Sequence, residues 1–140
     1  MATSNLVHGE VTEQIIKAFY KVYNTLGYGF LEKVYENSMA IALRKAGLRV
    51  VPQSPIDVFF EGELVGEYFA DLLVNDVVIV EIKRAEDTCN SHEAQLLNYL
   101  TATGKKVGLV LNFGPQPQFF RKVMTRNVDL PIAETSVQIR

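Results

Sequence analysis

The sequence has little cysteine and no long apolar run. Of its 140 residues only Cys89 is a cysteine, which excludes an internal disulfide framework and a four-cysteine zinc or iron–sulfur site. No stretch approaches the roughly 18 to 20 consecutive apolar residues of a membrane span, and the polar start, residues 1–10, lacks the basic and then apolar layout of a signal peptide. We therefore expect a soluble, cytoplasmic protein without a membrane partner.

The net charge is also small. It is −2, which gives no global attraction to a polyanion. The charge is uneven, because residues 1–100 carry 8 basic and 14 acidic side chains (−6), whereas residues 101–140 carry 6 and 2 (+4). The basic part could face phosphates while the acidic part holds a cation, and ordinary solvated surface charge is the alternative. The basic candidates are Lys105, Lys106, Arg121, Lys122 and Arg126.

Length and periodicity indicate one domain. With 48% hydrophobic residues, 140 residues can form one compact core, which we expect over about residues 8–124, with a tail at 125–140. Apolar residues at three- and four-residue steps predict helices at 11–26, 31–47 and 91–103, the last capped by Ser91.

Segments rich in β-branched and aromatic residues predict the strands, at 48–51, 56–60, 64–68, 107–113 and 118–124. Pro52 and Pro55 predict a break between the first two. Within residues 69–83, two apolar runs flank Asn75-Asp76, a pattern typical of a hairpin. The order of elements predicts an α/β protein with a mixed sheet packed by helices.

Three charged residues, Asp71, Glu81 and Lys83, lie on the predicted hairpin. Side chains alternate along a strand, so Glu81 and Lys83 point the same way. The run 77–80 is apolar on both faces, as in a central strand, which places a carboxylate at its end beside a low-dielectric interior. Burying an unpaired carboxylate is costly, so this pair needs a partner or a metal.

A magnesium or manganese ion would suit these acids, because both ions prefer hard oxygen ligands. Asp71, Glu81 and the backbone carbonyl of Ile82 could supply them. Such a metal activates water and offsets charge on a phosphoryl oxygen, as phosphodiester hydrolysis requires, and Lys83 could orient the water or stabilise the transition state. The alternative is a structural ion pair between Glu81 and Lys83.

Two helices add further candidates. Glu32, in the first turn of the second predicted helix, could reach the same metal, or could simply complement the helix dipole. On the third helix His92, Gln95 and Tyr99 are spaced by three and four and share one face, where they could orient a substrate phosphate, the water or the lysine. Alternatively Tyr99 is a core residue and His92 a surface residue.

Together these residues resemble the PD-(D/E)XK nuclease superfamily, and more closely its small bacterial and archaeal GxxExxY family, whose name matches Gly29, Glu32 and Tyr35. The resemblance covers roughly residues 8–124. It extends to the later segments Ala70-Asp71-Leu72, Val80-Glu81-Ile82-Lys83, His92 to Leu100 and Gly108 to Gly114. Ala70 stands where that superfamily has a proline before the first acid.

The resemblance implies a restriction-endonuclease-like core and a metal-dependent nuclease acting on DNA. It implies Glu32, Asp71 and Glu81 as ligands of Mg²⁺ or Mn²⁺, Lys83 as the catalytic lysine, and Gln95 with Tyr99 as the helix motif of RecB-type nucleases. Two alternatives stay open: a catalytically silent or partner-dependent interaction protein that keeps the fold, and an enzyme acting on another phosphodiester. A homodimer or a protein partner would fit a domain with so few basic residues.

Overall fold

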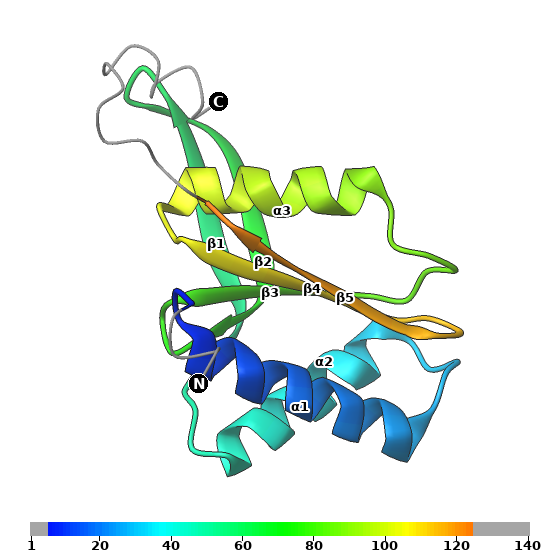
Figure 1. The fold of residues 1–140 in the computed structure, drawn as a ribbon. Helices are drawn as coiled ribbons and strands as arrows, with labels where there is room; N and C mark the ends of the chain where they lie inside the picture. Colours follow the sequence, from blue (N-terminus) through cyan, green and yellow to red (C-terminus); the bar gives the residue numbers. More distant parts are fainter. Residues whose placement is uncertain (1–5, 125–140) are drawn as a thin grey trace.

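The computed structural model describes residues 6–124 (Figure 1). The predicted tail, with Arg126, lies outside the described residues. The elements in chain order are α1 (Gly9–Leu26), α2 (Glu32–Lys45), β1 (Val50–Phe60), β2 (Glu63–Val74), β3 (Val78–Lys83), α3 (Asn90–Thr103), β4 (Val107–Phe113) and β5 (Pro117–Val123). The three predicted helices are therefore confirmed, with their ends shifted by one or two residues.

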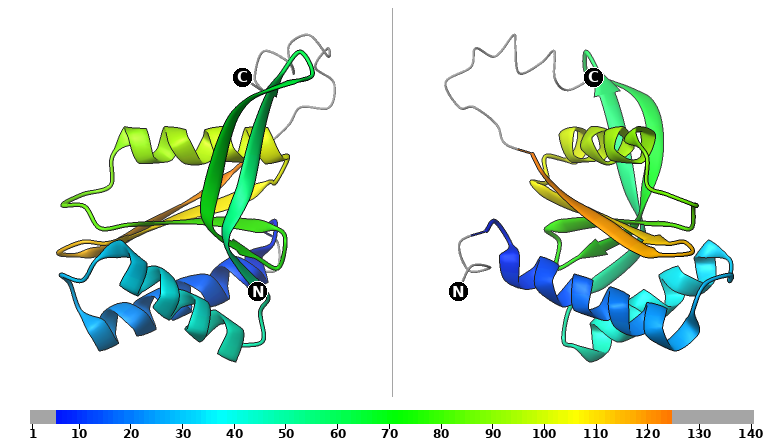
Figure 2. Two further views of the ribbon diagram at one scale, coloured as in Figure 1. Left: turned by 180° about the vertical axis from the view of Figure 1, so that it is seen from behind. Right: turned by 45° about the vertical axis from the view of Figure 1, so that its right-hand side comes forward.

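The strands form one mixed sheet in the order β1-β2-β3-β4-β5. The β3–β4 pair is parallel and the other three pairs are antiparallel. Helices α1 and α2 lie on one face of the sheet and α3 lies on the other (Figures 1 and 2). Each face has its own apolar layer, and the α/β prediction with a helix-packed mixed sheet is confirmed.

Strand β3 runs through the centre, and all its residues except Lys83 are buried. Val78, Val80 and Ile82 belong to the layer beneath α1 and α2, whereas Ile79 belongs to the layer beneath α3. Glu81 and Lys83 share the parity of Ile79, so they face α3. The doubly covered strand expected from the apolar run is confirmed.

The predicted hairpin turn is present between β2 and β3. Asn75 and Asp76 both have positive φ, 51° and 60°, which is the requirement of the tight turns that match strand twist. The amide of Asn75 also donates to the carbonyl of Arg49, at 2.8 Å. The turn is thereby fixed to the chain segment that enters β1.

The link between α1 and α2 is held by Tyr35. Its buried hydroxyl donates to the carbonyl of Gly27 at 2.6 Å and accepts from the amide of Phe30 at 3.1 Å. Its ring stacks on Phe113 of β4, with centroids 4.3 Å apart. Gly29, at φ 122°, adopts a conformation that suits only glycine. These contacts fix where α2 begins, so Tyr35 has a structural role.

The predicted break at Pro52 and Pro55 is wrong, because β1 is continuous from Val50 to Phe60. The reason is that β1 lies at the edge of the sheet. One side of an edge strand faces solvent, and a proline without an N–H on that side removes no hydrogen bond between strands. Near the prolines the irregularity is limited to Gln53, which has φ 52° and no pairing partner in β2. Strands expected separately at 64–68 and 69–74 are likewise one strand, β2.

The predicted cap of α3 is also wrong. The helix starts at Asn90, with Cys89 in the N-cap position and no side-chain hydrogen bond to the helix end. Ser91 instead lies inside the first turn, where its hydroxyl is 3.0 Å from the Cys89 sulfur.

Strands β1 and β2 form a long ribbon that projects beyond the other strands and passes alongside α3 (Figures 1 and 2). Their pairing continues to Phe60 and Glu63, whereas β2 pairs with β3 only over residues 72–74. The ribbon therefore separates from the sheet just before Leu72.

Candidate active site

Asp71 and Glu81 lie where β2 and β3 separate. The last paired residues are Leu72 and Val80. Beyond them the amide of Ile82 donates to Asp71 Oδ2 at 2.7 Å, and the amide of Asp71 donates to Glu81 Oε2 at 3.2 Å. The two side chains thus replace the backbone ladder with carboxylate contacts. The separation of the strands places the two acids side by side, and we call this pair the acid fork.

The acid fork is shielded from water and is destabilised as a dianion, with Glu81 buried and Asp71 half-buried. Glu81 is only 4% exposed. Burial, and after it the charge of Asp71, raises the pKa of the Glu81 carboxyl to about 8. Burial also raises the pKa of Asp71, against the opposing effect of the hydrogen bond from Ile82. Among residues 6–124 neither carboxylate forms an ion pair, so the fork favours a proton or a cation.

Lys83 is oriented by α3. Its ammonium nitrogen donates to Gln95 Oε1 at 3.3 Å, and within the described part of the chain it makes no ion pair with Glu81. The structure therefore does not support the alternative of a Glu81–Lys83 ion pair. Close packing of α3 on β4 helps to place Gln95, because a Cβ on Gly108 would lie 2.5 Å from the Leu96 side chain.

Tyr99 and His92 lie on the same side of the sheet. Burial, followed by the charges of Glu81 and Asp71, raises the pKa of the Tyr99 phenol, so its hydroxyl is protonated at neutral pH. Burial, followed by the charge of Lys83, lowers the pKa of His92, so its imidazole is neutral at pH 7. His92 Nδ1 is buried without a hydrogen-bond partner. The structure thus gathers three predicted α3 residues, Gln95, Tyr99 and His92, around Lys83 and the acid fork.

The acids of α2 approach the fork from the other helical layer. Glu32 is the exposed first residue of α2, and its charge contributes to the raised pKa of both fork carboxyls. Across residues 6–124, however, no group of three or more His, Cys, Asp or Glu side chains comes close enough to hold a metal ion. The fork brings together two of the three predicted acids, and Glu32 as a ligand stays a prediction.

Glu36 is a site residue that the sequence reasoning missed. It is buried, and it contributes more than Glu32 to the raised pKa of Asp71. Its carboxylate accepts from Lys33 Nζ at 3.0 Å and from Gln53 Nε2 at 3.0 Å. The available signal was its position four residues after Glu32, on the same face of the helix.

The fork fits a divalent metal ion in its chemistry. It offers adjacent carboxylate oxygens, the hard ligands that Mg²⁺ and Mn²⁺ prefer, and magnesium sites commonly use only one or two carboxylates with water. The raised pKa of Glu81 reflects the cost of a second negative charge, which a cation would remove. Asp71 and Glu81 are the residues that would hold the ion, and the Ile82 carbonyl stays a predicted addition.

The predicted phosphate-binding cations have partners inside the protein. Lys105 contacts Asp76 at 3.3 Å, Lys122 pairs with Glu93, and Arg121 donates to the carbonyl of Val7. Arg121 and Lys122 lie on the edge strand β5, two strands away from β3. Lys105 and Lys106 lie at the far end of the sheet, because residue 107 pairs with Val78, five residues before Lys83. That is roughly 17 Å along a strand. The structure therefore does not gather these four around the fork.

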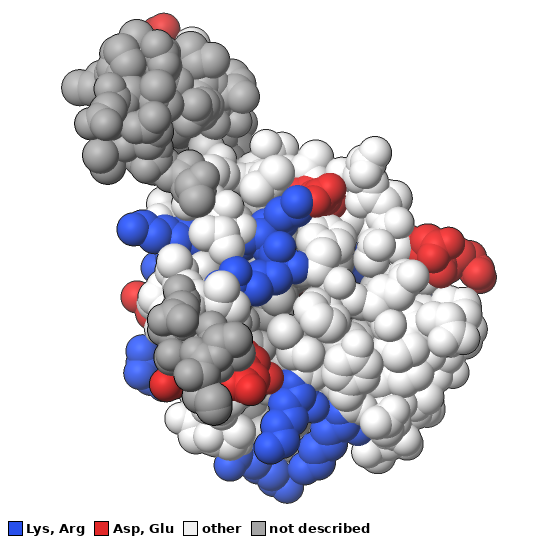
Figure 3. All heavy atoms as spheres, in the orientation of Figure 1, with Lys and Arg blue, Asp and Glu red and all other residues white. Residues whose placement is uncertain are grey.

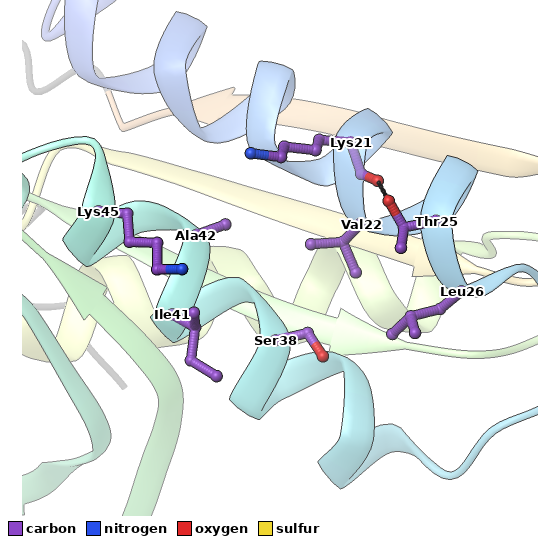
Figure 4. A pocket seen from close by; sticks show the side chains of 8 residues that line it. All are labelled: Lys21, Val22, Thr25, Leu26, Ser38, Ile41, Ala42 and Lys45. Carbon is purple, nitrogen blue, oxygen red and sulfur yellow. Dashed lines mark hydrogen bonds between the residues drawn. The ribbon is translucent and has the colours of Figure 1, made fainter.

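A different basic surface lies over α1 and α2 (Figure 3). Between the two helices is a groove of about 240 Å³, and Lys21 and Lys45 extend into it from opposite walls (Figure 4). Lys17 lines a neighbouring hollow together with the same two lysines. The sequence reasoning missed this surface, although Lys17 and Lys21 are four residues apart on one helix. The groove shares no residue with the acid fork.

The mixed sheet, the acid fork between β2 and β3 and the lysine held by α3 define a restriction-endonuclease-like protein. A family model described as the PD-(D/E)XK nuclease superfamily matches residues 9–124. The chain belongs to the PD-(D/E)XK nuclease superfamily. No curated protein matches it. Within residues 6–124 no helix is long and apolar enough to cross a membrane.

One solved structure supports the same fold. The structure titled "Crystal structure of SSO0001" is similar with a TM-score of 0.54 and 15% identity over 94% of this chain and 65% of that chain. This chain therefore spans about two thirds of that protein. An alkaline exonuclease (LHK-Exo) from Laribacter hongkongensis has a TM-score of 0.49 and 18% identity over 76% of this chain and 61% of that chain. At 15% identity the likeness to the first of these structures concerns the fold alone.

Proposed function

We propose that this protein is a metal-dependent nuclease that hydrolyses phosphodiester bonds in DNA, and that it is a member of the GxxExxY family. The observation that carries the proposal is the acid fork with Lys83 held beside it by Gln95. Membership of the nuclease superfamily supports phosphodiester hydrolysis in general. The raised pKa of Glu81 supports a requirement for a cation.

Each side chain has a separate task in this proposal. Asp71 and Glu81 hold Mg²⁺ or Mn²⁺. When bound, the metal supplies a Lewis acid that lowers the pKa of a water and offsets charge on a phosphoryl oxygen. Lys83 stabilises the negative charge that develops on the phosphate, and Gln95 keeps its ammonium group directed toward the fork.

Two further groups complete the α3 side. Tyr99 keeps its proton at neutral pH, so its hydroxyl can donate to a substrate oxygen. His92 is neutral, with an unpaired Nδ1, so it can take part in a hydrogen bond that the free protein does not make. Both groups therefore suit substrate positioning.

A partner-dependent nuclease is the second candidate, and one observation favours it. Lys105, Arg121 and Lys122 are already bound within the protein, so they are poor candidates for phosphate contacts near the fork. Nucleic-acid affinity depends strongly on such contacts. A second copy or another protein would then supply the missing part of the binding surface.

The test is cleavage of single-stranded, double-stranded and branched DNA, and of RNA, by the purified protein with Mg²⁺ or Mn²⁺, beside an EDTA control. Lys83→Ala should reduce cleavage by about 100-fold or more, while calorimetry shows that metal binding is retained. Arg49→Ala is the matched control, since Arg49 is an exposed cation beside the β2–β3 turn, at the opposite end of β3 from Lys83. Equal activity in wild type and Lys83→Ala would refute the assigned role. Metal binding without any cleavage would favour the partner-dependent candidate.

A further inference from the structure

A hollow lies between the β1–β2 ribbon and α3, on the side of the sheet that the acid fork faces. It has a volume of about 390 Å³, and its walls include Val58 and Tyr68 from the ribbon and Ser91, Gln95, Asn98 and Tyr99 from the helix. Figures 1 and 2 show α3 running alongside the ribbon. We call this hollow the ribbon pocket.

The ribbon pocket is connected to the candidate active site by two of its own residues. Gln95 lines the pocket and also accepts the hydrogen bond from Lys83. Tyr99 lines it as well, and the charges of Glu81 and Asp71 act on its phenol. A ligand in the pocket would therefore lie next to the phosphate on which the acid fork and Lys83 are proposed to act.

Tyr68 gives the pocket an aromatic wall. Its ring is 5.7 Å from that of Tyr99, tilted by 45°, so the two rings do not cover one another face to face. Tyr68 is 49% exposed, whereas Tyr99 is only 7% exposed. Aromatic side chains stabilise contacts largely through the area that they bury, and the half-exposed ring of Tyr68 has surface left for a flat ligand.

The other lining groups are neutral. Asn98 is exposed and its amide offers both a donor and an acceptor, and the hydroxyl of Ser91 offers the same. No lysine, arginine or acid is among the residues that line the pocket. A charged phosphate would find no counter-charge there. A flat, uncharged heterocycle with polar edges would be matched on its faces by Tyr68 and on its edges by Asn98.

We propose that the ribbon pocket is a nucleobase subsite, in which Tyr68 stacks on an unpaired base while the neighbouring phosphate lies at the acid fork. This inference rests on the proposed nuclease function. It assigns the substrate class as single-stranded DNA or an unpaired end, because bases inside a duplex already have their faces covered and must be unstacked to be read this way. Tyr68 and Asn98 would then determine specificity without touching the reacting atoms.

The experiment measures binding of short oligonucleotides in EDTA, so that it does not depend on cleavage. The probe is a single strand containing 2-aminopurine, whose fluorescence falls when it stacks, and a blunt duplex of the same sequence is the comparison. Tyr68→Leu should weaken single-strand binding about tenfold and abolish the quenching, with duplex binding unchanged. Tyr68→Phe, which keeps the ring, should behave as the wild type.

Phe69→Leu is the matched control. Phe69 is the next residue of β2, is 51% exposed and does not line the pocket, so its replacement removes a similar apolar area from the other face of the ribbon. The inference is overturned if Phe69→Leu weakens binding as much as Tyr68→Leu, if Tyr68→Leu binds normally, or if the wild type shows no quenching. If the probe is quenched but the cleavage assay with metal shows no activity, only the nuclease proposal fails. If the protein cleaves DNA but the probe is not quenched, only the ribbon-pocket inference fails.

Discussion

The raised pKa of Glu81 predicts that the metal-free protein loses stability as the pH rises. The carboxyl titrates near pH 4.5 in an unfolded chain and near pH 8 in the folded protein. Between these values the folded state binds one more proton than the unfolded state. The stability that the protonated Glu81 carboxyl contributes is therefore fully present below about pH 4.5, and it is lost as the pH rises to about 8. At about 1.4 kcal/mol for each pKa unit, the loss is roughly 3 to 5 kcal/mol.

This loss is large relative to the roughly 5 to 15 kcal/mol that stabilises a typical domain. The assay is urea unfolding in EDTA at pH 5, 6, 7 and 8, with the free energy of unfolding obtained by linear extrapolation. The wild type should be clearly less stable at pH 8 than at pH 5. Glu81→Gln keeps the shape of the side chain without its charge, so most of this pH dependence should disappear in that variant.

Glu67→Gln is the matched control, because Glu67 is an exposed acid on the same strand as Asp71. It should keep the pH dependence of the wild type. If Glu81→Gln loses stability with rising pH as steeply as the wild type, Glu81 is not the buried proton-binding group. If wild-type stability instead rises between pH 5 and 8, the sign of the argument is wrong.

Two further predictions follow from single contacts. Asp71→Asn should remove most of the heat of Mg²⁺ or Mn²⁺ binding in calorimetry, because it removes one of the two charges of the acid fork, and titrations that match the wild type would exclude Asp71 as a ligand. Tyr35→Phe should lower the free energy of unfolding by about 1 to 3 kcal/mol, because the Gly27 carbonyl and the Phe30 amide both lose the buried hydroxyl. An unchanged free energy of unfolding in urea would show that water takes the place of the Tyr35 hydroxyl.

The residues of β3 and α3 could be predicted because local periodicity determines their direction. Alternation along a strand places Glu81 and Lys83 on one face, and the apolar run before them indicates a central strand. Steps of three and four place His92, Gln95 and Tyr99 on one side of α3. Each of these inferences needs only neighbouring residues.

The missed features depend on contacts between distant segments. The buried carboxylate of Glu36 accepts a hydrogen bond from Gln53, on the edge strand 17 residues away. The continuity of β1 through Pro52 and Pro55 depends on its place at the sheet edge, which periodicity does not reveal. Lys122 looked available for phosphate, yet it pairs with Glu93 of α3. Partner choice between elements is set by the topology of the whole sheet.

The acid fork and the ribbon pocket have a common structural origin. The part of β2 that precedes Leu72 is not paired with β3 but stays paired with β1, so the sheet opens between β2 and β3 only. At the opening, the freed amides of Asp71 and Ile82 are satisfied by carboxylates, which places two acids side by side. Three residues earlier on the departing strand, Tyr68 faces the space that now separates the ribbon from α3.

One strand separation therefore places two acids for a cation and an aromatic ring for a base a short distance apart. A continuous β2–β3 ladder would pair those amides with backbone carbonyls instead, and would remove the reason for the carboxylates to be buried there. It would also draw the ribbon toward the sheet and close the pocket. The distance from the acid fork to the ribbon pocket is set by the backbone of β2, so a nucleotide bound by both would have its phosphate and its base positioned by the same strand.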